Sequence, residues 1–556
     1  MRVAVAGSGP SGIAAAHVLL ERGFDVDMLD GGREAEAESR DFAQRLLARL
    51  RAGQAPSAED RRFLIRGGGE CGRGQALRQA FDLLLRRRIA PAALEKRVLG
   101  STFAFASPAD DPPLEGAWLP RSLAVGGLAN VWGTACYPLR ADDYADWPVT
   151  PAELAPWFAR ATALFGVWGE ADALAEAYPL LGEMAALGGR EARDGGSPLE
   201  DVLAHWRANQ AALTGHGLIG GRARLAVAPP DAAERACLRC GLCLHGCPAG
   251  AMWHAAPALE RLKRHGRFRH LPGRTVRRFI EQAPGLVLQT EAEAEGGGES
   301  YDALFLAAGA VASLGIVAGS LEAGGTAVPV RENDMFVLPF RARLAGARGR
   351  VDPPRFALHE AVLAIAPGVI APRPAHLQLY QVTGPLLGPL APLAAALPEA
   401  AGVQLRRWLS RYVIGFLYLH SDDSRVMTVN IRRWRDGRPV LNVNAPAVPA
   451  GRDAAERAVA LLRRAARATA LRPVGGLMRA GPPGFSGHIG GTLPMRDRPG
   501  PLQCDHDGRL FGQPRVMVVD AAGFPAMPAQ NPTLTVAANA MRIADRFAAR
   551  QGRASR

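Results

Sequence analysis

Lysine is almost absent from this 556-residue chain, since Lys96 and Lys263 are its only two lysines. Arginine therefore supplies nearly all of the positive charge, and the formal net charge is +13. The basic residues are spread along the whole sequence and form no single stripe, so this charge does not indicate nucleic-acid binding. An anionic substrate, an acidic redox partner or an anionic membrane surface fits such a distribution better.

The chain also lacks an apolar run long enough to cross a membrane. Its most apolar stretch, Leu386 to Leu397, is broken by two prolines, and we interpret it as a buried or surface loop. Met1-Arg2 leads straight into the apolar strand Val3 to Ala6, so no signal peptide is expected. These absences predict a cytoplasmic protein with no transmembrane segment, although a partner subunit could still export it or attach it to a membrane.

Cysteine is scarce, with 7 in the chain, yet four of them fall within one short run. Their spacing is Cys-x2-Cys-x2-Cys-x3-Cys-Pro, which is typical of bacterial iron–sulfur loops. Without a signal peptide, such a cluster favours metal or cluster ligation in a reducing compartment over disulfides. The predicted ligands are Cys237, Cys240, Cys243 and Cys247.

The ligand set leaves alternatives open. In two-cluster ferredoxins the fourth cysteine of this spacing serves the other cluster, and this chain has a single such run. Either Cys247 completes a four-iron cluster, or another residue is the fourth ligand, or a three-iron cluster has three cysteine ligands. Zinc is less favoured, because structural zinc sites draw ligand pairs from separated knuckles, and unmetallated buried thiols are a further alternative. The isolated Cys71, Cys136 and Cys504 cannot be placed nearby from sequence, and His245 is interpreted as structural.

The start of the chain has the pattern of a dinucleotide-binding fold, in which a strand, a glycine motif, a helix and a second strand follow in order. Gly7 permits the tight turn, Gly9 lets the backbone approach a pyrophosphate, and Gly12 allows close helix–strand contact. Asp30, at the end of the second strand, can accept hydrogen bonds from the adenosine ribose. The motif alone does not separate FAD from NAD. The predicted elements are a strand at 3–6, a helix at 13–22 and a strand at 24–29.

The C-terminal region contains two more dense motifs, Gly487-His-Ile-Gly-Gly-Thr492 and Asn531-Pro-Thr-Leu-Thr535. With these the chain resembles the glucose–methanol–choline (GMC) oxidoreductases, FAD-dependent enzymes that oxidise alcohols. Gly126 to Gly133 is similar to the second FAD motif of the family, and Ala307 to Ala310 resembles its strand-end turn over the nucleotide. Residues 35–116 and 321–485 match the family poorly.

The resemblance implies that His488 and Asn531 face the flavin, His488 as the base and Asn531 orienting the substrate hydroxyl or its alkoxide. A neutral imidazole can take a hydroxyl proton near pH 7. The Asn531-Pro532 pair also predicts a helix start with Pro532 in the first helical position, whose free N–H groups could stabilise negative charge on reduced flavin. His506 lies in a turn-like segment and is interpreted as structural. The implied cofactor contacts are Gly7, Gly9, Gly12, Asp30, Gly126, Gly127, Asn130, Val276, Gly309, Asp520, Ala521, Pro532 and Thr533.

The cysteine run is similar to that of bacterial FAD-dependent glucose dehydrogenase catalytic subunits, which carry an iron–sulfur cluster. It is also similar to a stretch in long-chain alcohol oxidases of the family, where a cluster is not a defining feature. The resemblance implies a dehydrogenase that oxidises a C–OH group of a sugar or other alcohol. Electrons would leave through a 4Fe-4S or 3Fe-4S cluster to a redox partner such as a cytochrome, a quinone or a small subunit. The alternatives are a cluster-free oxidase using O2, a lipophilic alcohol as substrate, and a non-catalytic flavin and iron–sulfur electron carrier.

The predicted fold is an α/β nucleotide-binding, Rossmann-like FAD domain plus an α+β substrate domain with an antiparallel sheet covered by helices on one face. Both domains are discontinuous in the sequence. Strands at 275–280, 285–291 and 303–307 are expected to complete the FAD domain, and strands at 412–420, 425–431 and 440–443 to build the substrate sheet. The expected FAD domain comprises residues 1–34, 117–150, 225–320 and 486–556. Residues 35–116 are expected to form a helical insertion, with helices at 40–51 and 75–89. The expected substrate domain comprises residues 151–224 and 321–485, and the Cys-rich loop comprises residues 235–251.

Overall fold

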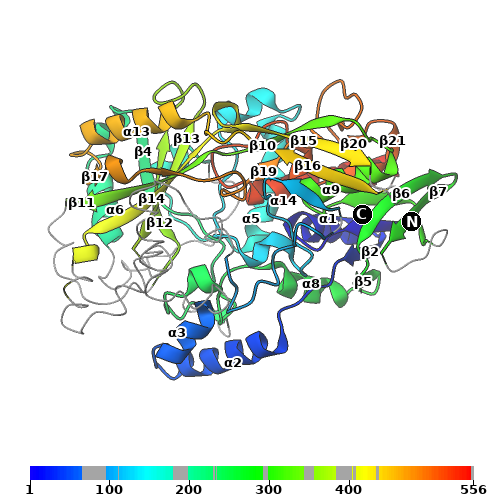
Figure 1. Ribbon diagram of the computed structural model, residues 1–556, viewed down its shortest axis with the longest axis horizontal. Helices are drawn as coiled ribbons and strands as arrows, with labels where there is room; N and C mark the ends of the chain where they lie inside the picture. Colours follow the sequence, from blue (N-terminus) through cyan, green and yellow to red (C-terminus); the bar gives the residue numbers. More distant parts are fainter. Residues whose placement is uncertain are drawn as a thin grey trace.

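The computed structural model describes residues 1–65, 96–110, 112–179, 198–228, 232, 235–291, 298–343, 356–382, 404, 408–433 and 438–552. The predicted helix at 75–89, the apolar stretch at 386–397 and Cys71 lie outside these residues. A parallel sheet lies toward one end of the molecule and the largest antiparallel sheet toward the other (Figure 1).

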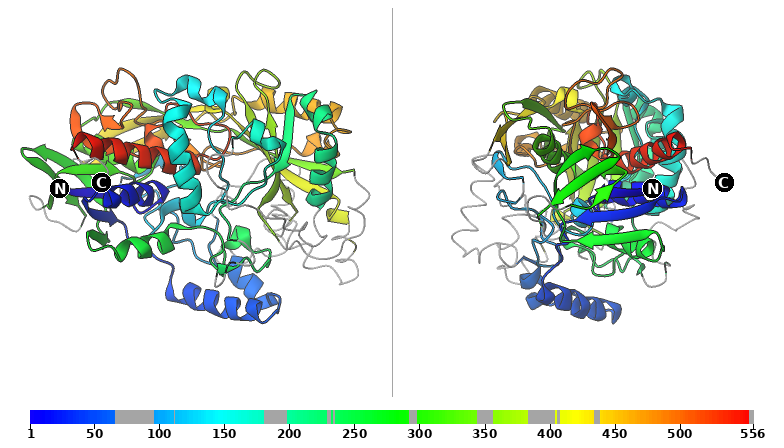
Figure 2. Two further views of the ribbon diagram at one scale, coloured as in Figure 1. Left: turned by 180° about the vertical axis from the view of Figure 1, so that it is seen from behind. Right: turned by 90° about the vertical axis from the view of Figure 1, so that its right-hand side faces the viewer.

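The parallel sheet has six strands, of which only β20 at one edge is antiparallel to its neighbour, and β1 lies near its centre between β2 and β9. Residues 3–6 of β1 are almost fully buried, as expected for a parallel strand covered on both faces. Helices α1, α14 and α5 run side by side along it (Figure 2). The predicted nucleotide-binding fold is therefore confirmed. Its elements are β1 (Arg2–Ala6), β2 (Asp25–Asp30), β5 (Phe268–Pro272), β9 (Ala303–Leu306), β20 (Arg509–Leu510), β21 (Gln513–Val518), α1 (Pro10–Glu21), α5 (Pro151–Phe165), α8 (Ala255–Lys263), α9 (Ala310–Ser320) and α14 (Thr533–Arg550).

Of the three strands expected to complete the FAD domain, one belongs to the parallel sheet. β9 pairs with β1 in parallel, whereas β6, β7 and β8 form a separate three-stranded antiparallel sheet. Phe279 and Leu288 of that small sheet are buried in the same apolar core as the parallel sheet. The bounds are β6 (Val276–Gln282), β7 (Gly285–Thr290) and β8 (Ser300–Tyr301).

The antiparallel sheet has seven strands and carries helices on one face, as predicted. Along β13 the leucines Leu377 and Leu379 enter a core shared with α6, α7 and α13. The alternate residues His376, Gln378 and Tyr380 point to the opposite face, because successive side chains of a strand alternate. The elements are β4 (Leu218–Arg222), β11 (Met335–Ala342), β12 (His359–Ile365), β13 (Ala375–Gln381), β14 (Tyr412–Leu419), β17 (Leu471–Pro473), β18 (Arg479–Ala480), α6 (Pro198–Ala208), α7 (Gln210–Thr214) and α13 (Arg452–Arg464).

Two strands expected in that sheet belong elsewhere. β15 and β16 pair with each other in a five-stranded sheet that also contains β10, and Met427 and Val429 of β15 are buried in the core of the parallel sheet. The sequence alternation identifies a strand but not its partner, so the expectation of a single sheet was wrong. The bounds are β3 (Leu114–Gly116), β10 (Ala327–Glu332), β15 (Val426–Arg433), β16 (Pro439–Asn444) and β19 (Ile489–Gly490).

Helices α2 (Ala37–Arg51) and α3 (Ala58–Ile65) project from the body at the lower edge of Figure 1. Phe42, Leu46 and Leu64 of this pair form a small core with Leu242, against which Cys240 packs. The helix pair therefore covers one side of the cysteine run.

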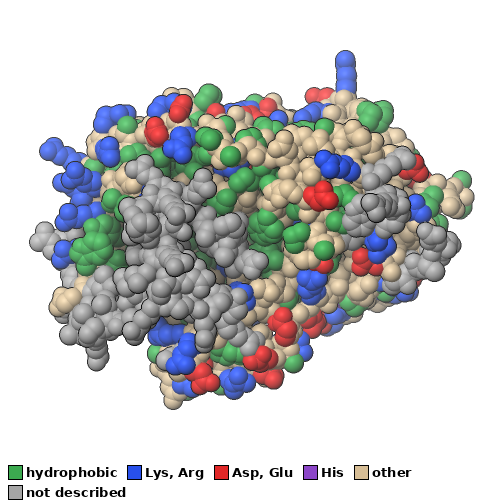
Figure 3. All heavy atoms as spheres, in the orientation of Figure 1, with side chains coloured by type: hydrophobic (Ala, Val, Ile, Leu, Met, Phe, Trp, Pro, Cys, Tyr) green, Lys and Arg blue, Asp and Glu red, His purple; other side chains and the backbone are tan. Residues whose placement is uncertain are grey.

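On the face seen in Figure 3, basic side chains lie at many places with acidic ones among them. Within the described ranges, no helix has both the length and the apolar character needed to cross a membrane.

Candidate functional site

The glycine motif after β1 packs tightly on one side and is open on the other. Gly7 has a φ of +111°, and a Cβ there would lie 2.4 Å from the Ala307 carbonyl oxygen. A Cβ on Gly12 would lie 1.9 Å from the Gly7 carbonyl oxygen. In contrast, a Cβ on Gly9 would meet no atom within 4 Å. Gly9 therefore leaves free space at the N-terminus of α1, where unpaired N–H groups suit the pyrophosphate of FAD.

The second glycine segment is tied to the first by a serine. The Asp30 carboxylate accepts hydrogen bonds from the Gly32 N–H, at 2.9 Å, and from the Ser8 hydroxyl. The Ser8 oxygen in turn accepts the Gly126 N–H at 2.9 Å. Sequence reasoning missed Ser8, which occupies a variable position of the glycine motif. Asp30 is thus held in place at the end of β2, where a ribose could reach it.

Asp520 joins the end of β21 to the start of α9. Its buried carboxylate accepts hydrogen bonds from the Gly309 N–H at 2.7 Å, the Ser313 hydroxyl at 2.6 Å and the Ala522 N–H at 2.8 Å. Asn130 donates from its amide to the Val125 and Gly127 carbonyls, which closes the second glycine segment. Direct FAD contacts of Asp520, Asn130 and the other predicted cofactor residues, which include Val276, Gly309, Ala521, Pro532 and Thr533, stay predictions.

His488 and Asn531, predicted as a catalytic pair, lie together although 43 residues separate them in the chain. The Asn531 Nδ2 is 3.0 Å from the His488 Nε2. Burial lowers the pKa of His488 to about 4, so its imidazole is neutral at pH 7. The ring stacks on Tyr418, with 5.1 Å between ring centroids. In this arrangement His488 can accept a proton from a hydroxyl group to which Asn531 donates a hydrogen bond.

The helix start beside this pair differs by one residue from the prediction. α14 begins at Thr533, and Pro532 occupies the cap position instead of the first helical position. No side chain caps the helix. The Asn531 amide faces His488 and is also bonded by Gln378, so tertiary contacts hold it and it does not cap the helix.

A buried polar network behind the pair was missed by sequence reasoning. Gln378 Nε2 donates to Asn531 Oδ1 and lies 3.1 Å from His376 Nε2, while Gln378 Oε1 accepts from the Tyr380 hydroxyl at 2.9 Å. His376 Nδ1 lies 2.7 Å from the Tyr178 hydroxyl. The sequence signal was the alternation of polar and leucine residues over 376–380, which marks a strand with a polar, enclosed face.

The turn that carries His488 is held by a buried glutamate. Glu332, at the end of β10, accepts the Gly484 N–H at 3.0 Å and the Ser486 hydroxyl at 2.9 Å. The Ser486 oxygen accepts the His488 N–H at 3.1 Å. Burial raises the pKa of Glu332 to about 7. These bonds fix the backbone on which the imidazole is mounted.

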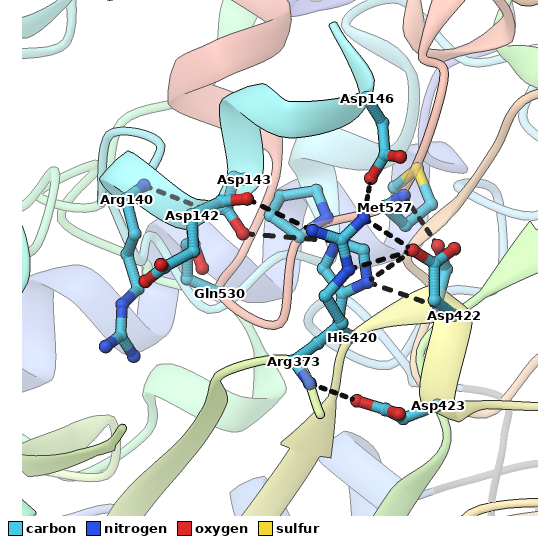
Figure 4. Close-up of polar contacts among 12 residues, drawn as sticks. Arg140, Asp142, Asp143, Asp146, Arg373, His420, Asp422, Asp423, Met527 and Gln530 are labelled. Carbon is cyan, nitrogen blue, oxygen red and sulfur yellow. Dashed lines mark hydrogen bonds and ion pairs between the residues drawn. The ribbon is translucent and has the colours of Figure 1, made fainter. Parts of the chain in front are cut away.

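An ion-pair cluster lies on the other side of the loop before α14 (Figure 4). Arg373 pairs with Asp146 and with Asp422, and its N–H bonds Asp423 at 3.0 Å. Asp146, Asp422 and His420 place their ligand atoms within 4.8 Å of one another. Because the Arg373 guanidinium already supplies positive charge there, we interpret the cluster as a link between η3 (Ala141–Asp146) and η8 (Ser421–Asp423) rather than a metal site.

The four cysteines of the predicted ligand set line one small cavity of about 20 Å³, together with Met252 and Phe356. Cys247 Sγ accepts the Ala251 N–H at 3.2 Å, and backbone N–H groups also bond Cys240 and Cys243. Burial raises the pKa of Cys240 to about 11 and that of Cys243 to about 12. In the described part of the chain no three cysteine sulfurs lie within 4.8 Å of one another.

The segment after the cysteines packs on the second glycine segment. The Trp132 indole N–H donates to the Trp253 carbonyl at 2.8 Å, and the two rings meet edge to face with centroids 5.8 Å apart. The Lys96 ammonium, which is partly buried, donates to the Val131 carbonyl at 2.8 Å. The segment that follows the cysteine loop is therefore joined directly to the second glycine segment.

Comparison with known proteins agrees with this geometry. Residues 422–540, which include both His488 and Asn531, match the sequence model of a family described as GMC oxidoreductase. This match supports membership of the GMC family for the C-terminal part of the chain. A search of curated proteins found no match.

Two solved structures share the fold of this chain over almost its full length. Pyridoxine 4-oxidase from Mesorbium loti has 15% sequence identity and a TM-score of 0.53, with 98% of this chain and 99% of that chain covered. An FAD-dependent oxidoreductase from Chaetomium thermophilum has 11% identity and a TM-score of 0.51, with 99% of each chain covered. The domain match and the shared fold support an FAD-dependent oxidoreductase, and the open glycine site fits FAD.

Proposed function

We propose that this protein is an FAD-dependent dehydrogenase that oxidises the C–OH group of a sugar or another polar alcohol to a carbonyl. The observation that carries the proposal is the contact of His488 Nε2 with Asn531 Nδ2 at 3.0 Å, beside the N-terminus of α14. FAD bound above the glycine motif would accept the carbinol hydrogen as a hydride.

His488 and Asn531 have complementary tasks in this proposal. A substrate hydroxyl that displaced the direct contact between the two side chains would donate its proton to the His488 Nε2 lone pair and accept a hydrogen bond from the Asn531 Nδ2. The alkoxide character that develops on the oxygen would be stabilised by the same Asn531 donor. Burial of His488 supports this role because it keeps the imidazole neutral and able to accept a proton.

A polar substrate is preferred over a lipophilic one on the resemblance of the cysteine run to that of FAD-dependent glucose dehydrogenase subunits. Tyr178, Tyr380, His376 and Gln378 are buried behind Asn531 and bond one another there, so they support the pair and give no preference for a substrate. The direct test is anaerobic stopped-flow reduction of the flavin by a panel of sugars, polyols and long-chain alcohols. We expect a sugar or polyol to bleach the flavin, and His488→Ala to slow this step at least about 100-fold. Near-normal reduction in His488→Ala would refute the assignment of the base.

We further propose that the cysteine cavity holds an iron–sulfur cluster through which electrons leave. Tetrahedral zinc with Zn–S bonds of about 2.3 Å would hold its sulfurs roughly 3.8 Å apart, whereas no three of the described cysteine sulfurs lie within 4.8 Å of one another. A cluster binds each cysteine to a separate iron and suits a wider cage. The backbone N–H groups aimed at Cys247 and its neighbours also support a cluster, since such bonds tune iron–sulfur centres.

Anaerobic purification followed by iron and acid-labile sulfide assays and EPR tests the cluster. Stoichiometric iron and sulfide would support it, and their absence from protein never exposed to air would refute it. A cytochrome, a quinone or a small subunit would then be the class of electron acceptor, and a reducing cytoplasm would suit the assembly of the cluster.

A cluster-free oxidase is the second candidate, favoured by the fold shared with a protein named pyridoxine 4-oxidase. It would transfer electrons from the flavin to O2. Hydrogen peroxide produced in equal amount to the oxidised alcohol, by protein without iron, would favour this candidate. A flavin that no alcohol bleaches would instead indicate a non-catalytic electron carrier.

A further inference from the structure

We propose that Gln378 is a positioning residue that sets the tautomer of His488 through the side-chain amide of Asn531. In this arrangement His488 carries its proton on Nδ1, which is buried and has no hydrogen-bond partner among the described residues, and its Nε2 lone pair accepts from Asn531 until the substrate takes that place. The inference rests on the proposed function for its catalytic meaning, although the tautomer itself can be measured without any reaction.

The fold places Gln378 where it can act only through other residues. It lies on β13 between Leu377 and Leu379, which are buried in the helix-covered core, so its own side chain is directed to the opposite face of the sheet. There it contacts Asn531, which in turn contacts His488. Gln378 is itself only 1% exposed, so water does not compete for these bonds.

Tyr380 determines which groups donate and which accept in the hydrogen bonds around Gln378. Burial raises the pKa of this phenol well above its usual range, so it keeps its proton and can donate it. A phenol is a good donor and an amide carbonyl a good acceptor, which places Gln378 Oε1 toward the Tyr380 hydroxyl at 2.9 Å. The NH2 group of Gln378 is then left to face the other side.

The two protons of that NH2 group have one acceptor each. One faces His376 Nε2 at 3.1 Å, and the other faces Asn531 Oδ1. Because Asn531 Oδ1 is taken by Gln378, its Nδ2 must point at His488 Nε2. A donor facing that nitrogen requires a lone pair on it, so the proton of the neutral imidazole resides on Nδ1.

The opposite orientation of the Gln378 amide is also consistent with hydrogen bonding at Asn531 and His488, but it would prevent His488 from acting as the base in an oxidation. If Gln378 turned its amide over, Asn531 would present Oδ1 to His488, and His488 would need a proton on Nε2 to satisfy it. The nitrogen facing the substrate could then accept no proton. The orientation of the Gln378 amide on β13 therefore decides whether His488 can act as a base.

The test uses the full-length protein labelled with ¹⁵N-histidine, in which the imidazole nitrogen shifts report the tautomer. The His488 signals are assigned by their loss in His488→Asn. We expect the wild type to carry the His488 proton on Nδ1 alone. Gln378→Met has similar length and no donor, so it should give a mixture of tautomers and slow flavin reduction about tenfold or more.

Thr469→Val is the matched control, because Thr469 is fully buried and hydrogen-bonded to the Ala465 and Leu471 carbonyls in the helix-covered core. It should change neither the tautomer nor the rate. If Gln378→Met does not fold, Tyr380→Phe removes only the first donor and should shift the tautomer in the same direction.

The outcomes separate this inference from the proposed function. A proton on Nε2 in the wild type, or unchanged His488 signals in the folded Gln378 and Tyr380 variants, would overturn the inference. A protein whose flavin no alcohol bleaches, but whose His488 tautomer responds to Gln378→Met, would refute the proposed function and support the positioning role.

Discussion

The side-chain amide of Gln530 donates a 2.7 Å hydrogen bond to the carboxylate of Asp143, 387 residues earlier in the chain. The same amide donates to the Pro138 carbonyl at 3.0 Å, and both partners of the first bond are almost fully buried. Because Gln530 directly precedes Asn531, this contact anchors the loop that presents the Asn531 amide to His488. The geometry of the pair therefore depends on a residue that touches neither substrate nor flavin in our proposal.

Gln530→Leu should destabilise the protein and loosen this loop. It removes a buried donor from Asp143, which costs about 1–3 kcal/mol in the free energy of unfolding. Asp146→Asn is the control, since it breaks an exposed pair with Arg373 that is worth less than about 1 kcal/mol. Urea unfolding of both variants measures the difference, and equal stabilities would contradict the anchoring role of Gln530.

Gly9→Ala and Gly12→Ala should fail in different ways. Gly9 has an ordinary φ of −69° and open space around its Cβ position, so Gly9→Ala should fold while filling the space expected for the pyrophosphate. The Cβ of Gly12→Ala would collide with the Gly7 carbonyl and should destabilise the whole sheet. The flavin-to-protein ratio and the melting temperature separate the two effects. A Gly9→Ala protein with full flavin content would place the cofactor elsewhere.

The pH dependence of the reaction should follow the low pKa of His488. With a pKa of about 4, the imidazole is already neutral at pH 5 and above. The rate of flavin reduction should therefore change little between pH 8 and pH 5, and should decline once the pH approaches 4. Anaerobic stopped flow with a stable flavin complex measures this profile. A decline centred near pH 6.5 would instead indicate an ordinary, solvated histidine.

The same pKa makes His488 a source of acid sensitivity. The folded-state pKa lies below the unfolded value of about 6.5, so the unfolded chain binds more protons as the pH falls, and stability present above pH 6.5 is lost toward pH 4. The contribution of this site should shrink by roughly 2 kcal/mol between pH 7 and pH 5. His488→Asn should lose correspondingly less stability over that interval in urea unfolding, and equal losses would contradict the low pKa.

Cys247→Ser should reveal whether the fourth cysteine is a ligand. Its sulfur lies in the shared cavity and accepts the Ala251 N–H, so we expect substitution to lower the iron content or convert a four-iron cluster to a three-iron one. Cys136→Ser, at a buried cysteine absent from the cavity lining, should keep the iron. Iron analysis and EPR of anaerobic samples measure both variants, and unchanged spectra for Cys247→Ser would make it a bystander.

Local pattern predicted the nucleotide site well because each part of it lies in one short segment. β1 and β2 lie within one residue of their expected bounds, and α1 begins three residues earlier than expected. Family resemblance supplied His488 and Asn531, whose contact no spacing could give. The network around Gln378 was not predicted, since alternation defines the faces of a strand but not what covers them. For the same reason β15 and β16 were assigned to the wrong sheet, and the proposed domain boundaries stay a prediction.

The order of segments in the parallel sheet has a consequence for biosynthesis. β1 pairs with β9, β9 pairs with β21, and α1 packs on α14, so the first and last parts of the chain share one core. During translation the N-terminal glycine motif therefore stays incompletely covered until β21, which begins at Gln513, and the helix α14 have been synthesised. Flavin loading should therefore be a late event, which depends on chaperones or on a loosely folded nascent state for most of synthesis.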